Sequence, residues 1–347
     1  MNSKYYILAL LIAVSCTSEV VLEPSDTSVK VIMNALLKTS DTDHLILLSA
    51  STVNETEALP GATVSVSVNG GSPVQAVYLS DNDDDMYSKP KAAYYLYQGS
   101  FQPGDEVLFE AKTKYGDVSS RVTVPGKVNM DNVDTLRTVI RGSGYTEVNM
   151  QFKIRVNDQA SSADYYRFTF NKYETFDRDG TGEKKTFWMP LRADGSSDPV
   201  LSDGTVKTGD FLSELLEMDN TYLIFSDELF NGTGRDMRLN VNMEGLIASF
   251  SFKEETPDYD DAYVMVNMEH MSFEEYYYLK AMTRLSNLGY DASLIFEPTT
   301  IPSNVEGGLG FVSISTVSDP AIFRIPDDIY LYEIRYREEH PEENPYN

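Results

Sequence analysis

The stretch ATVSVSVNGG, residues 62–71, alternates small polar and apolar side chains and then ends in Asn-Gly-Gly. Strict alternation puts Val64, Val66 and Val68 on one face, which is typical of a half-buried β-strand. Glycine accepts the positive φ angles that a tight hairpin turn requires. The stretch therefore predicts a β-hairpin in which the chain returns through residues 73–79.

Similar strand-like segments lie on both sides of this hairpin. They cover residues 29–37, 44–50, 93–97, 106–111 and 118–124, and Pro125-Gly126 follows the last of them. Short strands at this spacing, separated by turn residues, favour a sandwich of two β-sheets. We therefore expect residues 29–126 to form an Ig-like or transthyretin-like β-sandwich.

Residues 127–347 continue with longer alternating segments and one clear helix. The segments cover residues 149–156, 165–173, 221–225, 237–243, 246–252, 261–268, 307–314 and 329–334. Alternation over this length again predicts strands. This half of the chain is predicted to be a larger β-rich C-terminal domain with one or two helices.

The helix is predicted near residues 273–288, with a second, shorter candidate at 210–218. Ser272 and Glu275 have the spacing of a capping box, in which each side chain bonds the backbone amide of the other residue. Phe273, Tyr277, Ala281 and Leu285 recur every four residues and predict one apolar helix face, with Gly289 as the C-terminal stop.

The first residues have the pattern of a secretory signal. Lys4 precedes an apolar run at residues 5–13, and small residues lead to Cys16, the single cysteine of the chain. The run is too short to span a bilayer, which takes about 20 residues. The Ala-Val-Ser-Cys ending predicts cleavage of a signal peptide, residues 1–15, and lipid on Cys16, followed by a tether at residues 16–28.

The composition excludes some classes of protein. A hydrophobic fraction of 41% supports a packed core, so the chain is not of the disordered class. A formal net charge of −26 repels nucleic acid. The acidic surface serves either solubility or the binding of cations and basic partners.

Two acidic loops are weak calcium candidates, and no catalytic set stands out. Neither loop has the full ligand series of a calcium-binding hand, and the three histidines lie far apart in sequence. We expect no enzyme, no cofactor and no other metal site. The calcium candidates are Asp81, Asp83, Asp85, Asp177 and Asp179.

Exposed aromatic residues offer a ligand or partner surface, because tyrosine and tryptophan combine an apolar ring with a polar group. On an alternating strand one residue of each adjacent tyrosine pair faces outward. The alternative is ordinary packing between sheets. The candidates are Tyr94, Tyr95, Tyr97 and Trp188.

An ordered set of motifs resembles a known family. The set comprises residues 59–64 (LPGATV), 225–232 (FSDELFNG), 271–278 (MSFEEYYY), Glu297-Pro298 and 302–311 (PSNVEGGLGF). It is similar to the Bacteroidota lipoprotein family called domain of unknown function 4249. The motif in the last segment includes Asn304, Gly307, Gly308 and Gly310, and the glycines there indicate close backbone packing.

The resemblance implies an outer-membrane lipoprotein, often encoded near TonB-dependent receptors, and brings no established activity. We expect a lipid-anchored, non-enzymatic accessory or ligand-capturing component of TonB-dependent nutrient uptake, on the cell surface or the periplasmic face. A receptor of that class is the expected partner, and nucleic acid is not. The alternatives are a fimbrial or adhesive subunit and a glycan-active hydrolase.

Overall fold

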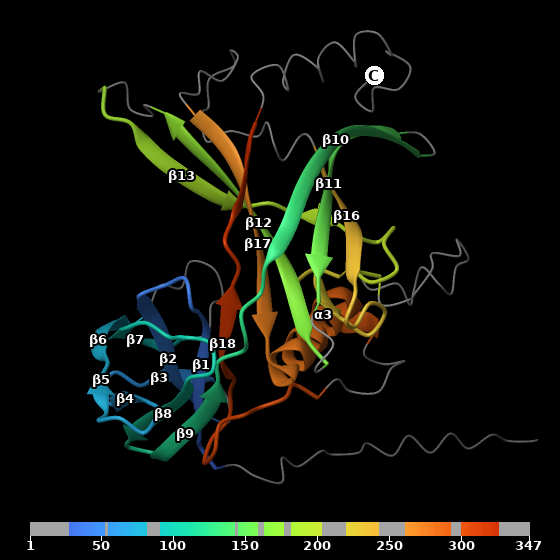
Figure 1. The fold of residues 1–347 in the computed structure, drawn as a ribbon. Helices are drawn as coiled ribbons and strands as arrows, with labels where there is room; N and C mark the ends of the chain where they lie inside the picture. The colour runs from blue at the N-terminus through green and yellow to red at the C-terminus, as the bar shows by residue number, and fades with distance from the viewer. Residues whose placement is uncertain are drawn as a thin grey trace, which may run out of the picture.

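The computed structural model describes residues 28–52, 55–81, 91–142, 145–158, 163–176, 182–202, 220–242, 261–292 and 300–325. This part of the chain is mostly β-structure with one helix, as predicted (Figure 1). The predicted signal peptide and tether, the helix at 210–218 and the strands at 246–252 and 329–334 lie outside the described residues.

The N-terminal lobe is a sandwich of two sheets. One sheet contains β1 (Lys30–Lys38), β2 (Asp43–Ser51), β3 (Thr56–Ala58), β6 (Val77–Asp81) and β7 (Ala93–Gln98). The other has the order β5 (Val74–Gln75), β4 (Thr63–Val68), β8 (Glu106–Thr113), β9 (Gly116–Thr123). Every second residue of these strands faces the space between the sheets, which gives one core. The Ig-like or transthyretin-like topology stays a prediction.

The predicted hairpin forms, but its return strand is short. Asn69 and Gly70 have φ angles of 52° and 69°, and the Gly71 amide donates to the Val68 carbonyl at 2.9 Å. β5 then follows β4 for two residues, after which the chain crosses to the other sheet and pairs with β7 as β6.

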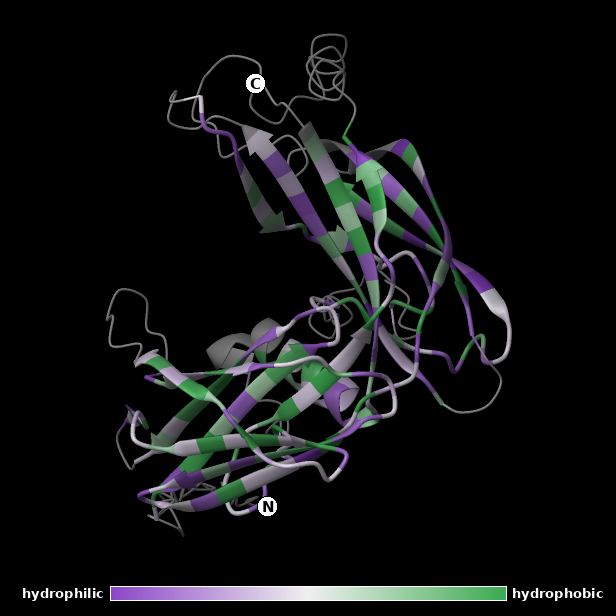
Figure 2. Cartoon of the chain, turned by 60° about the vertical axis from the view of Figure 1, so that its left-hand side comes forward, coloured by the Kyte–Doolittle hydropathy of each residue, from purple (hydrophilic) through white to green (hydrophobic). Residues whose placement is uncertain are grey.

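The C-terminal lobe also has two facing sheets. One has the order β10 (Met130–Gly142), β11 (Tyr145–Asn157), β16 (Gly234–Asn242), β14 (Ala193–Asp194). The other contains β12 (Tyr165–Phe176), β13 (Lys185–Pro190), β15 (Ile224–Ser226), β17 (Asp261–Met271) and β19 (Ala321–Arg324). Figure 2 shows the hydropathy alternating along the strands of both lobes. The apolar faces meet in a second core.

The expected boundary at residue 126 is wrong for one segment. β18 (Val312–Val317) pairs in parallel with β1 and antiparallel with β17, so it joins the two lobes in one sheet of 11 strands. Val305, Val312 and Ile314 belong to the N-terminal core. Residues far along the chain therefore complete the sandwich, and residues 29–126 do not form it alone.

The helix, α3 (Phe273–Ala292), begins where predicted, and the Ser272 half of the capping box forms: the Glu275 amide donates to Ser272 Oγ at 3.2 Å. The Glu275 carboxylate accepts instead from Ser315 of β18. The helix continues past Gly289, so that glycine is not its stop. The expected apolar face is wrong for Phe273, Tyr277 and Leu285, which are exposed, whereas Ala281 is buried as predicted.

α3 buries a different face. Glu275, Leu279 and Thr283 are buried, and the Tyr278 ring stacks on Phe311 with centroids 4.4 Å apart. This stacking and a hydrogen bond from Ser315 to Glu275 fix the rotation of the helix about its axis. Helix periodicity alone does not predict these two tertiary contacts.

Candidate functional site

A row of aromatic residues crosses the outer face of the C-terminal sheet. Strand register places Trp188 of β13 opposite Tyr173 of β12, Tyr173 opposite Tyr263 of β17, and Tyr263 opposite Arg324 of β19. Directly paired residues point to the same side of a sheet, with about 4.8 Å between neighbouring strands. We call Trp188, Tyr173, Tyr263 and Arg324 the aromatic row.

The aromatic row is accessible. Trp188 is 62% exposed, Arg324 is exposed, and the two tyrosines are half-buried. The rings of Tyr173 and Tyr263 stack with centroids 5.0 Å apart and planes 9° apart. Partial burial, with the neighbouring Tyr263, raises the pKa of the Tyr173 hydroxyl. Each of the two rings combines an apolar body with a hydroxyl group.

The row keeps its orientation because the other face of the same strands is buried. Val264 and Val266 of β17 and Phe170 of β12 point into the C-terminal core. Farther along β12, Lys172 and Glu174 form a buried ion pair at 2.5 Å. A one-residue slip of β12 would expose these groups, so the register that presents the row is strongly specified.

A second row beside the first adds polar and apolar groups. Asn171 lies opposite Pro190 and Met265, and Met265 lies opposite Ile322 of β19, which is 64% exposed. The outer face of this sheet thus combines aromatic rings with the amide of Asn171 and the guanidinium of Arg324, as surfaces that bind polar ligands with apolar faces do.

Of the predicted surface residues, Trp188 is in the row and the tyrosines of β7 are elsewhere. The prediction is wrong for Tyr95 and Tyr97, which are buried in the N-terminal lobe. Tyr95 Oη donates to the Leu59 carbonyl at 2.6 Å and accepts from the Ala62 amide at 3.0 Å, so it holds the turn before β4. Tyr94 lies on the opposite, half-buried face of β7.

The glycine motif packs backbone against backbone, beside β1 and β9. Gly307 has a φ of +75°, and a Cβ there would lie 2.6 Å from the Asp117 carbonyl oxygen. A Cβ on Gly308 would collide with the Val31 carbonyl, and one on Gly310, at φ +111°, with the Met33 carbonyl. The motif therefore closes the sandwich.

Asn304 belongs to the same closure. Its side chain donates to the Val312 carbonyl at 2.6 Å and accepts from the Val312 amide at 2.9 Å. The amide side chain thus takes the place of a neighbouring strand at the start of β18.

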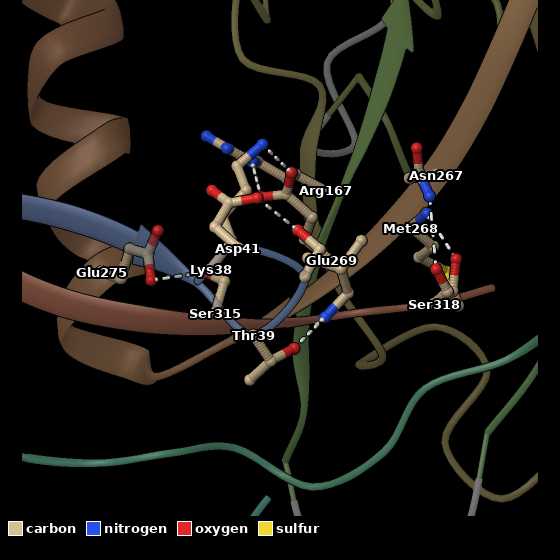
Figure 3. A network of polar contacts seen from close by, with 12 residues as sticks. Lys38, Thr39, Asp41, Arg167, Asn267, Met268, Glu269, Glu275, Ser315 and Ser318 are labelled. Carbon is tan, nitrogen blue, oxygen red and sulfur yellow. Dashed lines mark hydrogen bonds and ion pairs between the residues drawn. The ribbon is translucent and has the colours of Figure 1, made fainter. Parts of the chain in front are cut away.

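Buried charges join the two lobes, as Figure 3 shows. Glu269 of β17 is 0% exposed and pairs with Arg167 of β12 at 2.5 Å and with Lys38 of β1 at 2.6 Å. Burial opposes ionisation of Glu269, but the two cations outweigh it and hold the pKa of the carboxyl below its usual value. We call Lys38, Arg167, Glu269 and Glu275 the junction network.

The pKa of Glu275 of α3 is shifted in the opposite direction to that of Glu269. Glu275 is buried and accepts from Ser315 Oγ at 2.7 Å. Burial raises the pKa of the Glu275 carboxyl, and the nearby charge of Glu269 adds to this, against the opposing effect of Arg167. The network thus contains one glutamate held ionised and one that favours its proton.

Three aspartates converge beside the linker between the lobes. Asp158, Asp164 and Asp227 each offer a carboxylate oxygen within 4.8 Å of the others. Asp158 accepts from Tyr166 Oη at 2.8 Å and from the Gly232 amide at 2.9 Å. We call the three residues the aspartate cluster.

The aspartate cluster concentrates negative charge in a partly buried place, in which Asp227 is the most buried member. Burial, together with Asp158 and Asp164, raises the pKa of Asp227. His270 Nε2 lies 3.3 Å from Asp164, and its Nδ1 lies 3.0 Å from the Gly126 carbonyl. The carboxylates are closer together than the pair of a glycosidase, about 5 to 9.5 Å, so the cluster does not favour that chemistry.

Sequence reasoning missed the aspartate cluster and the junction network. Asp227 lies in the FSDELFNG segment, residues 225–232, but nothing in that segment predicts contact with Asp158 or Asp164. Of the calcium candidates predicted from the sequence, Asp83, Asp85, Asp177 and Asp179 lie outside the described residues, and for Asp81 only the backbone is described, at the end of β6.

Comparison with known proteins places the chain in a family. Residues 17–320 match the model of the domain of unknown function (DUF4249). A search of curated proteins gives no match. Within the described residues, no helix has both the length and the apolar character to cross a membrane. Because the match covers most of the sequence, the chain belongs to the family called domain of unknown function 4249.

Proposed function

We propose that the protein is an outer-membrane lipoprotein of Bacteroidota that captures a ligand for a TonB-dependent transporter and has no catalytic activity of its own. The observation that carries the capture role is the aromatic row, in which exposed Trp188 and Arg324 flank the half-buried Tyr173 and Tyr263. The lipid-anchor pattern before Cys16 supports the location.

The chemistry of the row favours a neutral saccharide as the ligand. Sugar rings have an apolar face that stacks on aromatic side chains and hydroxyl groups that bond to amides and guanidinium groups. Asn171 and Arg324 supply such donors beside the rings. The net charge of −26 disfavours polyanionic ligands.

The chain offers a direct test, since Trp188 is its one tryptophan. The mature protein is titrated with sets of neutral oligosaccharides while tryptophan fluorescence is recorded. At least one set should give a saturable change, and Tyr263→Ala should weaken the affinity by about tenfold, a loss of about 1.4 kcal/mol. Tyr94→Ala, which removes a half-buried tyrosine of the other lobe, should bind like the wild type.

Two outcomes would contradict the capture role. One is the lack of any saturable change with neutral saccharides, and the other is equal affinity of Tyr263→Ala and the wild type. If peptides gave a saturable fluorescence change and neutral saccharides gave none, the row would bind another class of ligand.

The location is tested separately. Cys16→Ser should carry no lipid and should leave the outer-membrane fraction, because one covalent anchor holds the protein there. A TonB-dependent transporter should co-purify with the wild type from membranes in mild detergent. Wild-type protein that carries no lipid, or a Cys16→Ser variant that fractionates unchanged, would refute the anchor.

An adhesive or fimbrial role is the second candidate, supported by one edge strand. β6 is the last strand in the order of the large sheet, and Val77, Tyr78 and Leu79 on it are exposed. An exposed edge strand can pair with a strand of another chain. This role predicts polymers that shear releases from cells, and a monomeric surface extract would argue against it.

A further inference from the structure

The aspartate cluster is built from three separate segments that end at rigid strands. Asp158 directly follows β11, Asp164 directly precedes β12 and Asp227 directly follows β15. The amide of Asp227 donates to the Asp164 carbonyl at 3.1 Å, which fixes these two segments against each other. The position of each carboxylate is therefore set by the sheet and not by a free loop.

One carboxylate oxygen of the cluster has a buried position and no donor. Asp227 is 1% exposed, and among the described residues its Oδ2 has no hydrogen-bond partner. A buried polar atom without a partner costs free energy, and a buried charge costs more. Two further carboxylates within 4.8 Å increase that cost, so the geometry favours a positive group at this place.

The hydrogen bonds to Asp158 are compatible with coordination by its oxygens. Tyr166 and the Gly232 amide each donate to one oxygen of Asp158, which orients the carboxylate and leaves lone pairs on both atoms. His270 contacts Asp164 from the side of the linker. Groups that orient ligands in this way are typical around metal ions.

We propose that Asp158, Asp164 and Asp227 together bind one calcium ion. The ligands are all carboxylate oxygens, which hard cations prefer and zinc sites seldom use alone. Their separation of up to 4.8 Å is twice a calcium–oxygen distance of about 2.4 Å. Magnesium requires shorter distances of about 2.0–2.1 Å and strict octahedral geometry. Water would supply the remaining ligands.

Calcium at this place would connect the three segments of the C-terminal lobe that meet beside the linker. The His270 ring also links this site to the linker, because one ring nitrogen lies beside Asp164 and the other beside the Gly126 carbonyl. Bound calcium should therefore raise the melting temperature in proportion to the logarithm of its concentration, because only the folded chain brings the three carboxylates together.

The experiment uses the mature protein freed of metal with a chelator. Calcium is titrated by calorimetry, and terbium, which replaces calcium, is titrated by luminescence excited through tyrosine. Tyr166 is bonded to Asp158, so bound terbium lies near a sensitising ring. We expect one saturable terbium site that calcium displaces at lower concentration than magnesium does.

Asp227→Asn should remove this site, because an amide replaces the most buried carboxylate. The matched control is Glu228→Gln, which removes the same charge from the next, exposed residue and should bind calcium like the wild type. Circular dichroism verifies that both variants fold.

The proposal fails if the wild type shows no saturable site, if magnesium competes as well as calcium, or if folded Asp227→Asn binds calcium with unchanged affinity. The wild-type titrations decide the question even if Asp227→Asn does not fold. Saccharide binding at the aromatic row is measured independently, so either proposal can fail alone.

Discussion

Replacing Glu269 with glutamine should be among the most destabilising conservative changes in the protein. The substitution keeps the shape but leaves Arg167 and Lys38 without their shared anion. Two unit charges about 4 Å apart interact by about 4 kcal/mol at an effective dielectric constant near 20. Lys38 is about a third exposed, so solvent screens its share and Arg167 dominates.

The net effect on stability is smaller than the sum of the two Coulomb energies, because the wild type also loses the hydration of a fully buried carboxylate. Breaking a buried ion pair by removing one partner typically costs about 3–5 kcal/mol. We expect a loss in this range for Glu269→Gln, measured by urea unfolding at pH 7.5 and followed by circular dichroism.

The stabilisation that Glu269 provides should decrease as the pH falls. The pKa of Glu269 is lowered in the folded state, so its stabilisation is complete above its unfolded pKa, about 4.3. This contribution disappears as the pH falls through the lower folded pKa. The stability of the wild type should therefore fall more steeply than that of Glu269→Gln as the pH drops from about 5.

Glu275→Gln is the matched control within the same network. The pKa of Glu275 is raised, so its ionisation lowers stability as the pH rises past its unfolded value. Glutamine removes that cost and still accepts from Ser315. Glu275→Gln should be neutral or stabilising at pH 7.5. A loss below about 1 kcal/mol for Glu269→Gln, or an equal loss for both variants, would refute the reasoning.

Three further predictions concern the N-terminal lobe. Gly308→Ala should destabilise by about 1–3 kcal/mol through a clash with a backbone carbonyl, whereas Gly61→Ala, with open space around it, should be near neutral in urea unfolding. Tyr95→Phe should cost about 1–2 kcal/mol, because it removes the hydrogen bond to Leu59, and calorimetric saccharide binding should not change. Burial lowers the pKa of His44, so the wild type should lose stability relative to His44→Phe as the pH falls through about 6.5, in thermal melts from pH 8 to 5.

Much of the local structure could be predicted because it depends on short-range patterns. Alternation identifies β4, and Asn69-Gly70 identifies the turn that follows it. The capping box of Ser272 marks the first turn of α3. The glycines at 307–310 indicate close backbone packing before the partner strands are known.

The face that a residue presents could not be predicted for α3 or β7. Periodicity selected Phe273 and Tyr277 as the buried face, but the helix buries Glu275 because Ser315 bonds to it. Alternation predicts that Tyr94 and Tyr95 point to opposite sides of β7. Which side is buried depends on where the facing sheet packs, and here Tyr95 is on the buried side.

The sequence by itself determined a mostly β chain, its hairpin turn, the start of its helix and its family. The tertiary structure alone decided that β18 joins the lobes, that Trp188, Tyr173 and Tyr263 form one row, and that the three aspartates meet. These features come from pairing between distant segments. The free energy of such pairing comes from burying two whole cores together, so a local sequence pattern cannot predict which distant segments pair.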